Sequence, residues 1–435
     1  MTEHSLSPLD QAHAHRLDGD EEAALRLAVA CARAAPEAPG PVALLARILV
    51  DAERAVPALA ASERLVDAFV RRGDLAAAVV ASTVALDAGE PQRPLLAQIA
   101  QAFARGSARV GQGGIAPPPF PHIPPISSEL GKLTGAALFV EAEQVLASYL
   151  EAADPVAEDA PLPALTLFGA LGTRELEQLL CAVRVEEVSH GHEIVRQGDA
   201  GNEAFVVARG LLKVVRRQGG DETILAQLGP GAIFGEMALM SESPRSASVV
   251  ALEPAQLLVL ARDELERAGE DAPELGAELS AFCHGRMHGN LVRHARVLSG
   301  LTPAQRTALL AELPSRLFER HELLIRREQE ASSIFLIASG AVSISMPDGG
   351  ERLVLATLGP GEVVGEMSLI LRRPANADVT ALYPTLTYEL TRELLTTLMR
   401  GYPPLLVELY DLATRRDEEI RAATDDALAT EDILV

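Results

Sequence analysis

Residues 230–250 read PGAIFGEMALMSESPRSASVV, and this stretch is the most informative part of the chain. β-Branched residues and glycines on both sides indicate short strands joined by turns. We expect one strand to end before Gly235 and Glu236, and a short helix to follow over 237–240. A loop then leads through Arg245 into the next strand.

The residue types in this stretch suit an anionic ligand that also carries hydroxyl groups. Gly235 allows a tight turn and a close approach of the backbone. The guanidinium of Arg245 can pair with two phosphate oxygens at once. Ser246 and the backbone N–H of Ala247 add donors, and a short helix offers unpaired N–H groups at its start. The Glu236 carboxylate would repel bare phosphate but accepts hydrogen bonds from a sugar.

The stretch resembles the phosphate-binding cassette of cyclic-nucleotide-binding domains, whose pattern is F-G-E-[L/I/V/M]-A-L-x…P-R-[A/S/T]-A. Every position of that pattern is present, at Phe234, Gly235, Glu236, Met237, Ala238, Leu239, Pro244, Arg245, Ser246 and Ala247. The resemblance covers roughly residues 163–285 and implies a jelly-roll β-barrel that binds cAMP or cGMP. It also implies that Glu236 takes the ribose 2′-hydroxyl, that Arg245 pairs with the cyclic phosphate, and that Ala238 and Leu239 add backbone N–H groups.

The resemblance leaves the nucleotide open. A hydroxyl after the arginine, here Ser246, is common in members that bind cGMP, but the same Arg-Ser-Ala occurs in bacterial cAMP receptors. We favour cAMP. The alternative is a barrel that keeps its Arg–Glu pair for structural reasons and binds nothing.

The same texture repeats further along the chain. Residues 191–252 align with 321–382 without a gap, and about 21 of 62 positions are identical. LGPG at 228–231 falls on LGPG at 358–361. Residues 165–180 and 297–313 match at the same offset, so each copy begins with a helix. The chain therefore contains a tandem duplication of one domain.

The second copy keeps Gly365 and Glu366 but has Ala375 where the first has Arg245. Asn376 replaces the serine, and Glu328 replaces Gly198. A phosphate bound here would face a carboxylate without an opposing cation, which costs several kcal/mol. We expect a degenerate barrel with a structural or dimerising role, although a different ligand stays open.

Residues 1–110 are rich in Ala and Leu and have helical periodicity. Gly19-Asp20 and Gly73-Asp74 each precede a helical run, and Pro36 and Pro91 follow those runs, as start and stop signals do. The pattern resembles tetratricopeptide repeats. The two units lie farther apart than one repeat of that family, and the large aromatic positions are absent.

These observations predict a multidomain α + β protein in which an N-terminal helical array precedes two cyclic-nucleotide-binding jelly-roll β-barrels with flanking helices. In chain order, we expect a helical domain at 1–110, a Pro/Gly linker at 111–127, a helix and connector at 128–162, the first barrel domain at 163–292, the second barrel domain at 293–402, and an acidic helix or tail at 403–435.

Composition excludes several other classes of protein. The formal charge of −23 disfavours general binding to nucleic acids or anionic membranes. Three dispersed cysteines fit neither a disulfide scaffold nor a zinc site. No signal peptide or apolar run of about 18 residues is visible, so we expect a cytoplasmic protein.

The sequence has none of the motifs of common enzymes, including P-loop, HExxH, GxSxG and kinase motifs. The segment after the second barrel is acidic and too short for a winged helix-turn-helix, so DNA binding is disfavoured. Tandem barrels behind a helical region are also the layout of cAMP-dependent protein kinase regulatory subunits, but the linker lacks their basic inhibitor site.

We therefore predict a non-enzymatic receptor that has no metal or cofactor and whose ligand is cAMP or cGMP. The first barrel would bind the nucleotide and signal to an unidentified protein partner through residues 1–110, and the flanking helices could support oligomers. The competing hypothesis is an interaction scaffold whose two barrels are ligand-free. The two hypotheses differ in whether Arg245 is held by a carboxylate.

Overall fold

The computed structural model describes residues 6–110, 132–157, 162, 167–218, 221–240, 244–348, 351–398 and 401–431. The chain divides into two compact units. The first consists of Met1–Glu236 and Arg245–Phe282, and the second of Met237–Pro244 and Cys283–Val435. The linker predicted at 111–127 lies outside the described residues.

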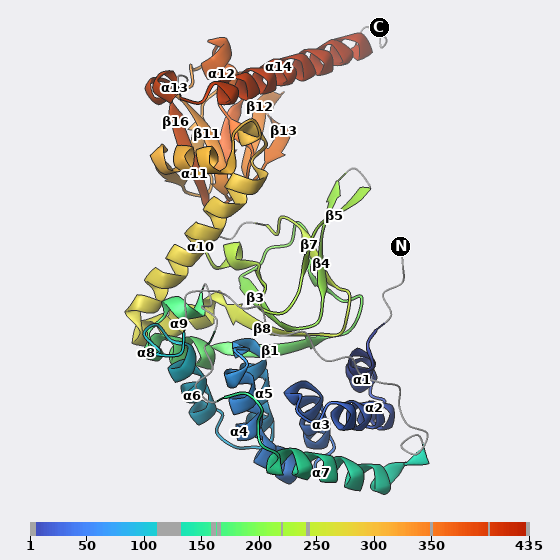
Figure 1. Ribbon diagram of the computed structural model, residues 1–435. Coiled ribbons are helices and arrows are strands. Elements are labelled where there is room, and N and C mark those ends of the chain that lie inside the picture. Colours follow the sequence, from blue (N-terminus) through green and yellow to red (C-terminus); the bar gives the residue numbers. More distant parts are fainter. Residues whose placement is uncertain are drawn as a thin grey trace. The chain divides into compact units, whose positions relative to one another are not determined.

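The first unit begins with a helical array, shown in blue to green in Figure 1. Its helices are α1 (Pro8–Leu17), α2 (Glu21–Ala34), α3 (Pro39–Asp51), α4 (Ala55–Arg71), α5 (Leu75–Asp87), α6 (Arg93–Phe103) and α7 (Gly135–Glu151). The predicted start signals are confirmed, because Asp20 and Asp74 cap α2 and α5 by accepting the backbone N–H of Ala23 and Ala77. No finding tests the tetratricopeptide label, which stays a prediction.

Helix α7 packs along α2, α3 and α4 and is held there by charged and aromatic contacts (Figure 1). Arg33 pairs with Glu141, and Arg54 pairs with Glu143 at 2.7 Å. The guanidinium of Arg64 lies 5.7 Å from the Tyr149 ring centroid. These contacts make α7 part of the array, although a long segment of chain separates it from α6.

The first barrel follows, and most of it belongs to the same unit, whereas Met237–Pro244 and the chain from Cys283 onward belong to the second unit. Its elements are η2 (Phe168–Ala170), α8 (Thr173–Cys181), β1 (Val183–Val188), β2 (Glu193–Val195), β3 (Glu203–Arg209), β4 (Leu212–Gln218), β5 (Asp221–Leu228), β6 (Ile233–Phe234), η3 (Glu236–Leu239), β7 (Ser248–Ala251), β8 (Ala255–Ala261), α9 (Arg262–Asp271) and α10 (Pro273–His294). They form two antiparallel sheets, β1-β8-β3-β6 and β2-β7-β4-β5. Apolar side chains from both sheets make the barrel core, including Phe205, Val207 and Leu212.

The second barrel repeats this architecture. Its elements are η4 (Arg296–Leu298), α11 (Pro303–Glu312), β9 (Ser315–Phe318), β10 (Leu323–Ile325), β11 (Ser333–Ser339), β12 (Val342–Asp348), β13 (Glu351–Leu358), β14 (Val363–Val364), α12 (Glu366–Leu371), β15 (Asp378–Ala381), β16 (Thr385–Thr391), α13 (Arg392–Leu398) and α14 (Pro403–Glu431). The sheets β14-β11-β16-β9 and β10-β15-β12-β13 have the same strand order as the first copy. Strands β2 to β8 coincide end for end with β10 to β16 in the gapless alignment of the two copies, so the fold class and the duplication are confirmed.

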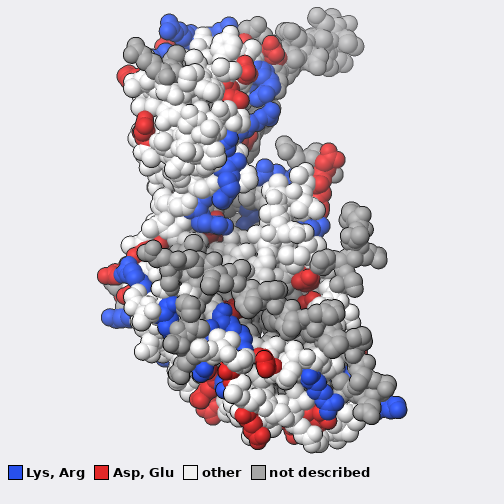
Figure 2. Space-filling view, viewed as in Figure 1, with Lys and Arg blue, Asp and Glu red and all other residues white. Residues whose placement is uncertain are grey.

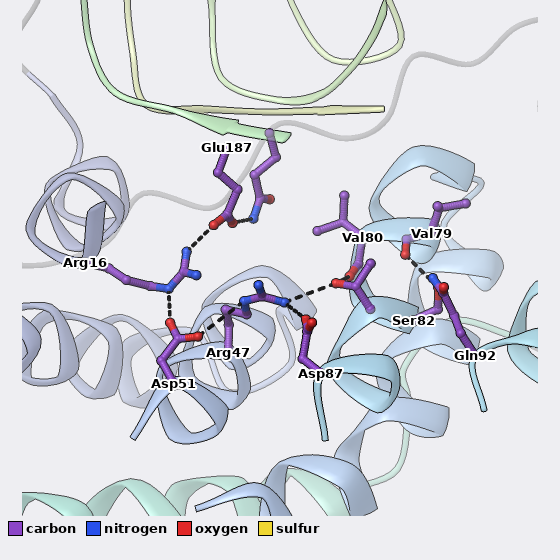
Figure 3. A network of polar contacts seen from close by, with 11 residues as sticks. Arg16, Arg47, Asp51, Val79, Val80, Ser82, Asp87, Gln92 and Glu187 are labelled. Carbon is purple, nitrogen blue, oxygen red and sulfur yellow. Dashed lines mark hydrogen bonds and ion pairs between the residues drawn. The ribbon is translucent and has the colours of Figure 1, made fainter. Parts of the chain in front are cut away.

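The helical array contacts the β1-β8-β3 face of the first barrel through buried ion pairs. Arg16 of α1 donates both to Asp51 of α3 and to Glu187 of β1, at 2.7 and 2.5 Å (Figure 3). Asp10 of α1 pairs with Arg209 of β3, and both side chains are about nine-tenths buried. These contacts join the array and the barrel into one unit.

Candidate functional site

The predicted cassette begins at the turn between β6 and η3. Phe234 ends the strand and stacks on Phe205 of β3, with ring centroids 5.0 Å apart. Gly235 has φ +75°, a conformation that side-chain-bearing residues rarely adopt. Glu236 is 5% exposed and begins η3, which spans Glu236–Leu239 rather than the expected 237–240. Because η3 is one short 3-10 turn, any anion site here depends chiefly on side chains and turn N–H groups.

The side chain of Arg245 contacts this turn. Its Nη1 donates to the carbonyl oxygen of Gly235 at 3.2 Å, and its Nη2 donates to that of Glu203 at 2.8 Å. Its guanidinium lies 5.9 Å from the Phe205 ring centroid. The Arg245 backbone exchanges hydrogen bonds with Gly198 N–H and Asp199 C=O, both at 2.9 Å. The arginine is therefore positioned at both its backbone and its head group.

The positive charge of Arg245 is held by neutral groups. Among the described residues, no carboxylate forms an ion pair or hydrogen bond with it. The Glu203 carboxylate pairs with Arg184 at 2.5 Å instead. Burial lowers the pKa of the Arg245 guanidinium, and the more distant charges of Glu203 and Glu236 oppose that shift. Within the described chain, the site thus contains a partly buried cation without an ion-pair partner.

The remaining predicted residues differ in their exposure to solvent. Ser246 is exposed, and Ala247, next to it, is buried just before β7. Ala238 is buried and Leu239 half-buried. Met237 packs against the apolar cluster of the second unit, which includes Met287 and Leu291 of α10. The chain therefore passes within one residue from the first unit at Glu236 to the second at Met237.

Sequence reasoning missed two groups beside the arginine. The Glu203 carbonyl accepts one of its hydrogen bonds, and Gly201 leaves room beside its guanidinium. Gly201 lies close to Gly198 in the chain, but its spacing from the cassette carries no recognisable signal. Only the fold brings it next to Arg245.

The second cassette has the same backbone hydrogen bonds as the first, and a side chain of α14 contacts its carboxylate. Gly365 has φ +89°, and Ala375 exchanges backbone hydrogen bonds with Glu328 and Gln329, as Arg245 does with Gly198 and Asp199. Glu366 is 2% exposed and accepts a hydrogen bond at 2.6 Å from Arg416 of α14. Arg416 also donates to the Val363 carbonyl at 2.8 Å.

The arginines that precede Ala375 do not supply the missing cation. Arg373 pairs with Asp417 of α14 at 3.2 Å, and Arg372 is exposed. Leu405, Leu409 and Ala413 of α14 are buried, the two leucines in the same apolar cluster as Leu369 of α12. An arginine of the chain's own C-terminal helix therefore takes the cassette carboxylate in this copy.

Metal-binding and membrane-spanning features are absent from the part of the chain that the structure describes. No three His, Cys, Asp or Glu side chains in those ranges are grouped as metal ligands. No helix there is long and apolar enough to cross a bilayer. On the face of the helical array shown in Figure 2, acidic and basic side chains are interspersed rather than gathered into a continuous basic surface.

Comparison with known proteins identifies the two barrels. The family model described as "Cyclic nucleotide-binding domain" matches residues 185–271 and 315–402. A cAMP-dependent protein kinase regulatory subunit of Yarrowia lipolytica is 30% identical over 49% of this chain and 54% of that protein. The type II regulatory subunit of Drosophila melanogaster is also 30% identical, over the same two shares.

The chain spans about half the length of these curated relatives. Among solved structures, the regulatory domain of Toxoplasma gondii PKA with cAMP is 22% identical, with a TM-score of 0.27 over 58% of this chain and 92% of that one. The family match agrees with the repeated strand order and the complete first cassette. Residues 185–271 and 315–402 are therefore two members of the cyclic nucleotide-binding domain family, arranged in tandem.

Proposed function

We propose that the first domain binds a cyclic nucleotide, with the cyclic phosphate at Arg245. The observation that carries this proposal is the state of the arginine, whose partly buried guanidinium is held by two carbonyl oxygens and by no carboxylate of the described residues. Burial disfavours such a charge, and a phosphate that replaced the weak partners would form charge-assisted hydrogen bonds. A purely structural arginine would be expected to pair with an acid.

The other polar positions of the cassette then have roles that follow from their place and from the family resemblance. Glu236 accepts the ribose 2′-hydroxyl, and Gly235 lets the backbone approach the sugar and phosphate. Exposed Ser246 can face the base.

The apolar positions of the cassette support the turn. Ala238, Leu239 and Ala247 contribute backbone N–H groups to the phosphate. Phe234, stacked on Phe205, anchors one end of the turn, and Met237 anchors the chain as it leaves Glu236.

The preferred nucleotide is cAMP, with cGMP as the competitor. The relatives at 30% identity are named as subunits of cAMP-dependent kinases, and a mouse relative at 26% identity is named cGMP-dependent protein kinase 2. Ser246 fits both, so substituting it tests the preference directly.

Met237 would couple nucleotide binding to the position of α10. Its neighbour Glu236 would hold the ribose, while Met237 packs in the apolar cluster of Met287 and Leu291 on α10. Movement of η3 on binding would disturb that packing and bias the position of α10. We propose that the chain is a non-enzymatic receptor and that the helical array of residues 1–110 presents this state to a protein partner.

A thermal-shift titration with cAMP and with cGMP tests the proposal. Ligand at about 100 times its dissociation constant adds roughly 2.7 kcal/mol, or about 5–10 °C, to the transition of the first unit. Arg245→Ala should abolish that shift. The exposed Arg216 of β4 provides a matched control, because Arg216→Ala should respond as the parent does.

Two outcomes would contradict the proposal. If millimolar cAMP and cGMP both left the transition unchanged, the ligand-free scaffold would be favoured. If Arg245→Ala kept the full shift, the nucleotide would bind elsewhere.

A Ser246→Ala variant that lost only the cGMP response would assign the hydroxyl to the guanine.

A further inference from the structure

The backbone conformation at Gly201 does not require a glycine. Gly201 is absent from the residues with positive φ, which include its neighbour Gly198 at +89°. Its conformation is therefore open to other residues, and only the space around it argues for glycine. A Cβ atom at this position would lie 2.3 Å from Nε of Arg245 and 2.5 Å from both Cζ and Nη2. Real Cβ atoms essentially never make contacts this short, so alanine here would displace the guanidinium.

The guanidinium lies against both Gly201 and Gly235, and the space that these two glycines leave for it is called the channel. A Cβ at Gly235 would lie 2.8 Å from Nη1 of Arg245 and 3.1 Å from the Glu203 carbonyl oxygen. Gly235 also needs its positive φ, whereas Gly201 needs only the space. Because Gly201 has no side chain, it leaves the space that the Arg245 guanidinium occupies.

The second barrel has lost this channel together with its arginine. The gapless alignment of the two copies places Ala331 on Gly201, Ala375 on Arg245 and Ile325 on Val195. Ala331 is 8% exposed, so its methyl group is part of the packing. A Cβ at Gly365 would meet the Ser333 carbonyl oxygen at 2.6 Å and Cδ1 of Ile325 at 3.0 Å, whereas a Cβ at Gly235 would meet the Glu203 carbonyl oxygen and Nη1 of Arg245. In the second barrel, therefore, an apolar carbon of Ile325 lies beside Gly365, and a buried methyl group stands at the position that aligns with Gly201.

We propose that Gly201 is the positioning residue that admits Arg245 to the phosphate position, and that Ala331 and Ile325 close the second barrel to an arginine at position 375. The inference rests on the proposed function for its ligand-binding consequence. Its packing consequence can be measured without any ligand.

A double-mutant cycle in the full chain tests the first barrel. Without nucleotide, Gly201→Ala should lower the midpoint temperature for thermal unfolding of the first unit by about 3–6 °C. The reason is that Arg245 loses its hydrogen bonds to the carbonyl oxygens of Gly235 and Glu203. In an Arg245→Ala background the same change should cost nothing, since the double variant carries the two alanines that the second barrel has at these positions. Gly229→Ala is the matched control, since nothing lies within 4 Å of its Cβ position, and its effect should be equal in both backgrounds.

The reciprocal cycle tests the second barrel. Ala375→Arg alone should lower the second transition, because the channel is filled. The triple variant Ile325→Val/Ala331→Gly/Ala375→Arg should recover most of that loss. Recovery without nucleotide would show that the two barrels differ in the space available for the arginine, as well as in the arginine itself.

Nucleotide affinity gives the third readout. Gly201→Ala should weaken binding at least about tenfold, as Arg245→Ala does, and the double variant should bind no more weakly than either single variant. An equal cost of Gly201→Ala in both backgrounds, or no rescue in the triple variant, would overturn the inference. If neither the parent nor any variant bound nucleotide while the thermal cycle stayed non-additive, the proposed function would fail and the role of Gly201 would stand.

Discussion

Arg209, Arg245 and Arg416 are each at least partly buried, and they differ in what neutralises them. Arg209 pairs with Asp10 and Arg416 with Glu366, whereas Arg245 is held, among the described residues, by carbonyl oxygens. A buried ion pair mainly avoids the cost of an isolated charge, whereas carbonyl partners leave net charge at the site. Arg245 is therefore suited to an anionic ligand, and the other two are suited to holding segments together.

The N-cap Asp74 predicts a pH effect at the residue scale. Burial raises its pKa to about 6, although it accepts the backbone N–H of Ala77. Because the folded-state pKa lies above the unfolded value, the folded protein gains stability as pH falls from about 6 toward 4. Asp74→Asn keeps the acceptor and removes the charge, so it should stabilise the first unit by about 2 kcal/mol at pH 7.5.

Thermal unfolding between pH 4 and pH 8 checks this expectation. The variant should show a flatter pH profile than the parent, with the largest gain above pH 6. Asp20→Asn is the matched control, because Asp20 caps α2 in the same way but is exposed. A variant that lost stability at pH 7.5 would show that the charge itself supports the cap.

At the scale of elements, α14 packs against the second barrel and contributes Arg416 to the second cassette. Its apolar side chains pack near α12, and Arg416 reaches Glu366 and the carbonyl of Val363. The described part of α14 runs as a single helix from Pro403 to Glu431, which does not fit a winged helix-turn-helix.

Removing Arg416 should therefore destabilise the second unit. Arg416→Ala leaves Glu366 buried without its cation, for which a loss of about 3–5 kcal/mol is typical. Arg415→Ala changes the exposed neighbour and should cost less than about 0.5 kcal/mol. Denaturant unfolding of the second unit measures both. Equal effects of the two variants would show that the Arg416–Glu366 pair contributes nothing specific.

At the scale of the whole molecule, the helical array and the first barrel form one unit, and the second barrel with α14 forms another. The array is held to the barrel by Asp10–Arg209 and by Arg16 bridging Asp51 and Glu187 (Figure 3). We therefore expect two calorimetric transitions, with nucleotide raising the one that contains the array.

The Asp10–Arg209 pair gives the corresponding prediction. Asp10→Asn leaves Arg209 buried without its paired anion and should destabilise the first unit by about 3–5 kcal/mol, while the second transition stays in place. Differential scanning calorimetry resolves the two. A separate early transition of the array alone would contradict the assignment of array and barrel to one unit.

Much of this organisation follows from short-range sequence patterns. The tandem repeat is visible as identity between positions far apart in the chain, whereas the N-caps at Asp20 and Asp74 and the turn at Gly235 depend on residues close together. Local backbone preference and turn chemistry determine these features, so their spacing in the sequence predicts them. The second copy departs from the pattern at Ala375, Asn376 and Glu328, and its lack of a nucleotide stays a prediction.

The partners of the buried charges depend on tertiary structure instead. Arg416 lies 50 residues after Glu366, and Arg209 lies 199 residues after Asp10. No periodicity links such residues, since their pairing follows from how α14 and α1 pack on the barrels. The residue pattern alone predicts two barrels and a first cassette with every motif position present. Which groups hold each buried arginine depends on the fold, because close packing brings together side chains that the chain keeps far apart.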